Sequence, residues 1–97
     1  MATIVVSNVK TVDRAVVFEV EVLNSPEAAD VDLFITTGRQ SGGNERSIIV
    51  PVRTGSSRMV SVPFDGVSGP MTDYRIQVQQ MGSSDPVSIW QGRLPVS

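Results

Sequence analysis

Residues 14–23 read RAVVFEVEVL, and this stretch decides the fold class. Its large apolar side chains recur at every second position: Val16, Phe18, Val20 and Val22. Glu19 and Glu21 occupy alternate positions between them. Because successive side chains of a β-strand point to opposite faces, this period of two predicts a strand with one dry face and one wet face. The apolar face must pack against another part of the protein, so the strand belongs to a hydrophobic core.

Six further runs of β-forming residues are separated by turn-forming residues. They are residues 3–9, 30–37, 47–52, 58–64, 73–81 and 87–96. Short strands at spacings of about 8–14 residues are typical of a sandwich of two sheets. The best candidate for helix is a single turn at 25–30. We therefore predict an all-β fold, an antiparallel two-sheet sandwich of about seven strands, with residues 1–97 as one domain.

Three prolines lie within or beside the predicted strands: Pro51, Pro63 and Pro95. Proline has no N–H to donate to a sheet, so it is confined to edge strands and bulges. We expect the three residues to protect sheet edges from unwanted pairing. Pro51 is also expected to interrupt the run at 47–52.

The composition argues against catalysis. The chain has no cysteine and no histidine, and Lys10 is its only lysine. Thiolate nucleophiles, imidazole bases, disulfides and sulfur- or imidazole-bound metals are therefore excluded. Two pairs of carboxylates could suggest a glycosidase or a calcium site: Glu19 with Glu21, and Asp30 with Asp32. In each pair the residues are two positions apart, which is the spacing of outward side chains on an amphipathic strand, so no catalytic or metal site is inferred. We predict that the protein is not an enzyme and uses no cofactor and no metal.

Charge and hydropathy limit the partners. The net charge is −2 and the isoelectric point about 4.9, which argues against nucleic-acid binding through bulk positive charge. No signal-peptide pattern follows Met1, and no apolar run approaches the roughly 20 residues of a membrane helix. Residues 1–37 hold six acids against two bases, whereas residues 38–97 hold six arginines against four acids. We expect neither a nucleic acid nor a membrane as partner.

Residues 70–78, PMTDYRIQV, place Pro70, Thr72 and Tyr74 at alternate positions before alternating apolar residues. This segment resembles the tyrosine-corner segment of fibronectin type III domains. The resemblance implies an immunoglobulin-like or fibronectin type III-like sandwich. In such a corner the ring of Tyr74 fills the core and its hydroxyl bonds backbone upstream. The early-strand tryptophan of that family is missing, Phe18 is the candidate to replace it, and the only tryptophan is Trp90.

The polar segment 38–45, GRQSGGNE, is the first candidate contact site. It lacks the Gly-Lys-Ser/Thr ending of a phosphate-binding loop. Loops on rigid sandwiches often carry recognition, and arginine binds carboxylate or phosphate with two parallel hydrogen bonds. The predicted interaction loop comprises Arg39, Gln40, Asn44 and Arg46. The alternative is a hairpin tip without a binding role.

Two aromatic residues form the second candidate contact site. Phe34 falls on the outer face of its predicted strand, and Trp90 lies in the last strand. Exposed aromatic side chains of this kind form apolar contact patches. The alternative is that either ring lies under a neighbouring loop.

These features favour a structural or interaction module. The most specific hypothesis is a bacteriophage virion protein, a capsid decoration or cement protein, located in the virion or the host cytoplasm. Its partners would be capsid or other assembly subunits, including copies of itself. The alternative is a ligand- or protein-binding immunoglobulin-like module of a larger or intracellular assembly. The fold alone does not select between the two.

Overall fold

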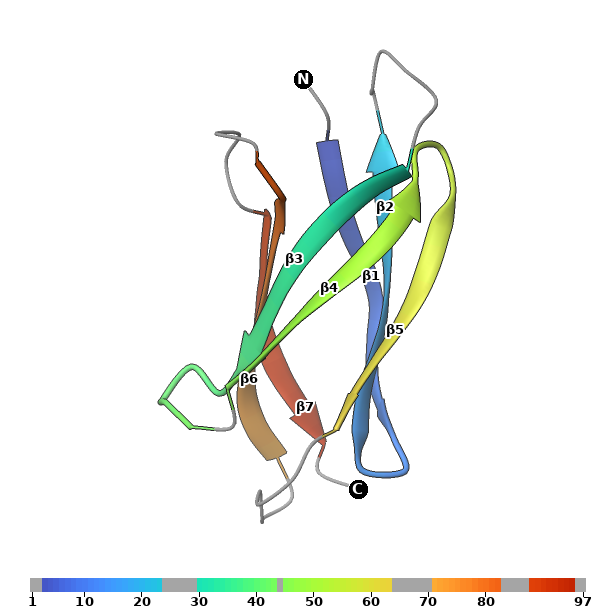
Figure 1. Ribbon diagram of the computed structural model, residues 1–97. Helices are drawn as coiled ribbons and strands as arrows, with labels where there is room; N and C mark the ends of the chain where they lie inside the picture. The colour runs from blue at the N-terminus through green and yellow to red at the C-terminus, as the bar shows by residue number, and fades with distance from the viewer. Residues whose placement is uncertain (1–2, 24–29, 44, 64–70, 83–87, 96–97) are drawn as a thin grey trace.

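The computed structural model of the protein describes residues 3–23, 30–43, 45–63, 71–82 and 88–95. These residues form seven strands: β1 (Thr3–Val12), β2 (Ala15–Leu23), β3 (Asp30–Gly38), β4 (Arg46–Arg53), β5 (Ser57–Pro63), β6 (Met71–Gln80) and β7 (Ser88–Pro95). All strand pairs are antiparallel. One sheet has the order β1-β2-β5 and the other the order β4-β3-β6-β7 (Figure 1). The predicted all-β, two-sheet sandwich of seven strands is confirmed.

The core lies between the two sheets and follows the predicted alternation. The inward side chains of β2, from Val16 to Val22, are completely buried. The other buried apolar residues are Val31, Leu33, Ile35, Val50, Val52, Val60, Val62, Tyr74, Ile76, Val78 and Leu94. Phe64, which the pattern places inward, lies outside the described residues. The core is thus built mainly of β-branched side chains, which suit a pleated sheet.

The first hairpin is longer than the sequence pattern predicts. β1 extends to Val12 instead of ending at residue 9, and Asp13-Arg14 forms the connection to β2. Both turn residues have positive φ, 48° and 62°, as a two-residue type I′ turn requires. Asn8 also has positive φ, 53°, and the pairing register shifts between Ser7 and Lys10. This bulge accommodates one extra residue of β1, because Asn8 and Val9 together lie opposite Phe18, and the strand continues beyond it.

The prolines lie on the edges of the sheets, as predicted. Pro51 is in β4, which pairs only with β3, while Pro63 and Pro95 end the edge strands β5 and β7. The predicted interruption at Pro51 is wrong, because β4 runs unbroken from Arg46 to Arg53. On an edge strand the missing N–H faces away from the partner strand and costs no ladder hydrogen bond.

Three polar contacts tie the two sheets together at their sides. The chain crosses from β4 to β5 through Gly55, whose φ is 82° and whose N–H donates to the Val22 carbonyl at 2.9 Å. Arg58 Nη1 donates to the Pro51 carbonyl at 2.7 Å. On the opposite side, Thr11 Oγ1 donates to the Pro95 carbonyl at 2.8 Å. The helical turn considered at 25–30 lies outside the described residues except for Asp30, which begins β3. None of the described residues belongs to a helix that could span a membrane.

Candidate interaction surface

An uncharged strip crosses the outer face of the four-stranded sheet. Phe34 of β3 lies opposite Ile49 of β4 and Gln79 of β6, and Gln77 lies opposite Ile89 of β7. Strand pairing places all of these side chains on one face, because directly opposed residues share a side of the sheet. We call this set the outer strip: Phe34, Thr36, Ser47, Ile49, Gln77, Gln79 and Ile89.

The apolar members of the outer strip are exposed to solvent. The exposed fraction is 37% for Phe34, 57% for Ile49 and 54% for Ile89. The outer face of the three-stranded sheet differs, because Glu19, Glu21 and Lys10 lie at its centre. Protein interfaces typically have a charge-depleted centre that contains aromatic and apolar anchors. The four-stranded sheet therefore presents the better contact face.

Charged side chains lie at both ends of the outer strip. At one end, Arg53 Nη1 is 3.8 Å from Asp30 Oδ1, and both side chains are largely exposed. At the other end, Arg93 lies directly opposite Asp73, and Arg75 lies opposite Gly38. An uncharged centre with a polar margin is the common plan of a protein-binding surface.

The 39–45 loop beside this surface has an ordered backbone in its described part. The Gly42 N–H donates to the Arg39 carbonyl at 3.0 Å, and the Arg39 N–H donates to the Gly43 carbonyl at 3.1 Å. Gly42 and Gly43 have φ values of 100° and 93°, which side chains with a Cβ atom rarely adopt. Gly42 and Gly43 are therefore explained by the backbone conformation of the turn.

Asp73 of β6 holds the loop against the sheet. Its Oδ2 accepts a hydrogen bond from the Ser41 N–H at 2.7 Å, and its Oδ1 accepts one from Ser41 Oγ at 3.3 Å. Arg39 Nε is 3.8 Å from Asp73 Oδ1, and Gln40 Nε2 donates to the Tyr74 carbonyl at 3.2 Å. Two members of the predicted interaction loop thus already bind the protein's own sheet.

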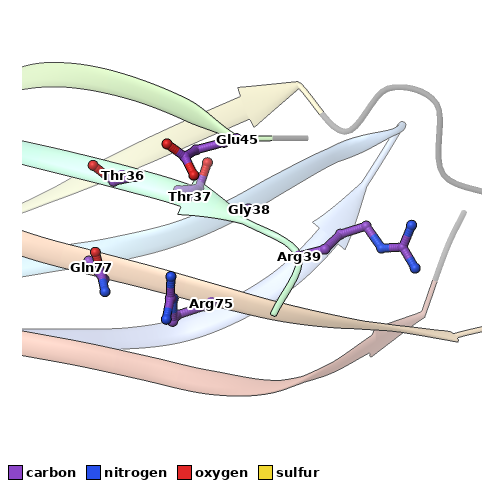
Figure 2. Close-up of a pocket in the computed structure, with 7 residues that line it drawn as sticks. All are labelled: Thr36, Thr37, Gly38, Arg39, Glu45, Arg75 and Gln77. Atoms are coloured by element: carbon purple, nitrogen blue, oxygen red, sulfur yellow. The ribbon is translucent and has the colours of Figure 1, made fainter. Parts of the chain in front are cut away.

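The predicted loop residues do not converge on one site. Figure 2 shows the Arg39 side chain directed away from Arg75, Gln77 and Glu45. The hollow between these residues measures only about 20 Å³, which is room for a single water molecule. Arg46 begins β4 opposite Thr37, and Asn44 lies outside the described residues. The predicted bidentate pairing of Arg39 and Arg46 with an anion stays a prediction.

We expect Asp73→Ala to loosen the loop and to cost about 1 kcal/mol of stability, because its hydrogen bonds to Ser41 are partly exposed to water. Hydrogen exchange should accelerate at the amides of Ser41 and Gly42 and stay unchanged in β2. Asp73→Asn keeps one carbonyl oxygen as acceptor and serves as the matched control. Equal exchange in the Asp73→Ala and native proteins would show that Asp73 does not anchor the loop.

Tyr74 is buried on the inner face of β6, with 1% of its surface exposed. Burial raises the pKa of its hydroxyl, while Thr37 and the charge of Arg46 act to lower that pKa. Thr37 Oγ1 has no partner of full hydrogen-bond geometry among the described residues, although it lies near the Tyr74 hydroxyl. The ring of Tyr74 lies in the core, and the tyrosine corner itself stays a prediction. The upstream backbone that would accept its hydroxyl, residues 64–70, lies outside the described residues.

Trp90 lies on the other face of the sheet from Phe34. It is opposite Ile76, whose side chain is in the core, and it packs partly buried against that core. A Cβ atom at Gly92 would be 2.8 Å from Cη2 of the Trp90 ring, so the ring covers this glycine. Trp90 and Phe34 therefore do not form one patch. The apolar residues that share the outer face with Phe34 are Ile49 and Ile89. The sequence alone did not identify either of them as a contact residue.

A second, open depression of about 340 Å³ lies beside the bulge of β1. Asn8, Val9, Lys10, Glu19 and Met59 line it. The Glu19 carboxylate already accepts a hydrogen bond from Asn8 Nδ2 at 2.6 Å. Within the described part of the chain, no three acidic side chains gather as a metal site would need.

The chain matches no family model, no curated protein and no solved structure. A functional assignment must therefore rest on the physical chemistry of its surfaces. Of these, the outer strip combines exposed aromatic and aliphatic side chains with a centre free of charge.

Proposed function

We propose that the protein is a non-catalytic interaction module that binds a partner protein through the outer strip. The observation that carries the proposal is the exposure of Phe34 between Ile49 and Gln79, within a strip that has no charged side chain among its members. Water contact with these side chains is unfavourable, and burial against a partner would remove it. A rigid sheet also loses little conformational freedom on binding.

The chemistry of the strip defines the partner. Phe34 provides an aromatic anchor, and Ile49 extends the apolar contact toward the edge of the sheet. The side-chain amides of Gln77 and Gln79 offer both donors and acceptors. The expected partner surface is therefore apolar at its centre with hydrogen-bonding groups around it, and its binding depends little on ionic strength.

The strand order supports an immunoglobulin-like sandwich of the fibronectin type III kind. In the constant-type immunoglobulin arrangement the fourth strand joins the sheet of the first and second strands. Here β4 pairs with β3 in the other sheet. The buried Tyr74 in β6, the strand before the last, agrees with the same assignment. Because this architecture serves many functions, the assignment concerns fold only.

The specific setting that we propose is the surface of a bacteriophage capsid, where the chain would act as a decoration protein. A small sandwich without cysteine needs no oxidising compartment to fold, which suits assembly inside a host cell. Its outer strip would contact capsid subunits. Location of the gene among virion assembly genes would support this setting, and failure of the protein to bind shells of the encoding phage would refute it.

Ile49→Lys should weaken binding to such shells about tenfold or more, because a charge would be buried in an apolar contact. Phe34→Ala should also weaken binding, through loss of the aromatic anchor. The measurement is co-sedimentation of the purified protein with shells that lack it. Met59→Lys is the matched control, since Met59 is equally exposed but lies on the other sheet. If only Met59→Lys reduces binding, the outer strip is not the contact surface.

A further inference from the structure

The four edge strands of the sandwich are not equally protected. β4, β5 and β7 each carry a proline, whereas β1 has none in its ten residues. In the described chain, β1 pairs with β2 on one side only. The only charged residue of β1 is Lys10, near its C-terminal end. Where an edge strand has neither proline nor charge, its backbone N–H and C=O groups can pair with another strand. The open edge of β1 is therefore a place for strand addition.

The open edge is concentrated in one half of β1, the segment Thr3–Ser7, whose sequence is TIVVS. This half pairs with β2 in regular register, and it contains neither proline nor charge. Its inward side chains Ile4 and Val6 are only partly buried, whereas Val20 and Val22 of the neighbouring β2 are fully buried. The core is thus incompletely covered along this edge. The other half of β1 contacts β7 through the hydrogen bond from Thr11 to Pro95.

We propose that the Thr3–Ser7 segments of two copies of this chain pair antiparallel across a two-fold axis at Val5. In this register Val5 faces its own copy, Ile4 faces Val6, and Thr3 faces Ser7. The three strands of each copy join into one continuous six-stranded sheet. The contact is isologous, so it closes on two copies.

A second copy fits this edge because the segment is complementary to itself. The partly buried Ile4 and Val6 cover each other across the new strand pair, which removes apolar surface from water. No like charges meet in the pair. The nearest carboxylate in the row is Glu21, opposite Val5. Glu21 and its copy lie three strand spacings apart, roughly 14 Å, which exceeds the screening length of about 8 Å at physiological salt.

The bulge limits the pairing to this segment. Asn8 has a φ of 53°, and the register with β2 shifts between Ser7 and Lys10. A bulge of this kind twists the strand and disrupts the ladder, so a partner strand would end there. The far edge of the enlarged sheet is β5, which ends at Pro63. Both features favour a closed pair over an open fibre.

Single cysteines test the register directly, because the native chain has none. Val5→Cys places two sulfurs across the two-fold axis, where the Cα atoms of opposed residues are about 4.5–5.5 Å apart, within disulfide range. Mild oxidation should give a disulfide-linked dimer as the main product. Met59→Cys is the matched control, since Met59 is exposed on β5, the opposite edge of the same sheet. Equally fast cross-linking of both variants would overturn the proposal.

Sedimentation equilibrium over a concentration series gives the independent measurement. The native protein should associate reversibly to a dimer, and Val5→Lys should raise the dissociation constant about tenfold or more by placing like charges together. Ile49→Lys, on the other sheet, should leave dimerisation unchanged. A native protein that stays monomeric at every concentration, or a dimer lost in Ile49→Lys, would contradict pairing through β1. Binding of the outer strip to capsid shells is measured separately, so either proposal can fail alone.

Discussion

Phe18→Ala should destabilise the protein by about 3–5 kcal/mol, the largest effect that we expect from one substitution. Phe18 is completely buried in β2, between Val16 and Val20 on the same face, and it lies opposite Val60 of β5. Its removal takes away apolar contacts and leaves a cavity that rigid strands cannot close. Native domains are stable by only about 5–15 kcal/mol, so a large share of the total would be lost.

Chemical denaturation followed by the fluorescence of Trp90 measures this loss. Phe34→Ala removes the same atoms from the outer face of β3, where the ring is 37% exposed. That variant should lose clearly less stability than Phe18→Ala, because its ring is already in contact with water and leaves no closed cavity. Similar losses in the two variants would show that the inside–outside assignment of the sheets is wrong. The Phe34→Ala variant is therefore useful in two measurements. It is the control for stability, and it should bind capsid shells more weakly while remaining folded.

Tyr74→Phe should cost about 1–3 kcal/mol, because it removes a buried hydroxyl next to the buried hydroxyl of Thr37. The ring and its packing are retained, so the loss reports on polar groups alone. Thr37→Val in the same chain should recover part of the loss, since replacement of both polar groups by apolar ones of similar shape is close to neutral. Neutral behaviour of the single variant would show that the Tyr74 hydroxyl stabilises nothing.

The same substitution should change the alkaline limit of stability. Burial raises the pKa of Tyr74 in the folded protein above the ordinary value of 10.0. The unfolded chain therefore loses its phenol proton first as pH rises, and stability falls between the ordinary pKa and the folded pKa. Below about pH 10 this contribution is fully present. Denaturation at pH 8 and above pH 10 should show a smaller decrease for Tyr74→Phe than for the native protein.

Alternation in the sequence was enough to predict the sandwich, since it marked the inward side chains of β2, β3 and β6. Local conformation at non-glycine residues was harder to predict. Asp13 and Arg14 form a type I′ turn with positive φ, although the second position of such a turn is usually glycine and here is Arg14. Asn8 lies in a bulge that lets β1 continue to Val12, and the alternating pattern of apolar residues does not indicate such a bulge. The edge position of Pro51 was predicted correctly, but the sequence did not show that β4 would continue through it unbroken.

The membership of the outer strip was predicted only in part, because its residues come from four strands. Phe34 was recognised from its outward position in β3. Ile49 and Ile89 lie on the same face as Phe34 because β3 pairs with β4 and β6 pairs with β7. A single sequence does not specify these strand pairings. Trp90 falls on the inner face because β7 pairs with β6 in a register that sets Trp90 opposite Ile76. Strand neighbours and register are long-range properties, whereas the alternation of each strand is local.

The pairing of β2 with β5 is, like that of β3 with β6, a long-range contact that slows folding. Phe18 pairs with Val60, and the whole of β3 and β4 lies between them in the chain. The entropy of closing that long loop must be overcome before the pair contributes any stability. Refolding should therefore proceed in milliseconds to seconds, the range of domains dominated by non-local strand pairing. Until β5 joins the sheet, the edge of β2 that β5 covers in the native fold has no strand partner.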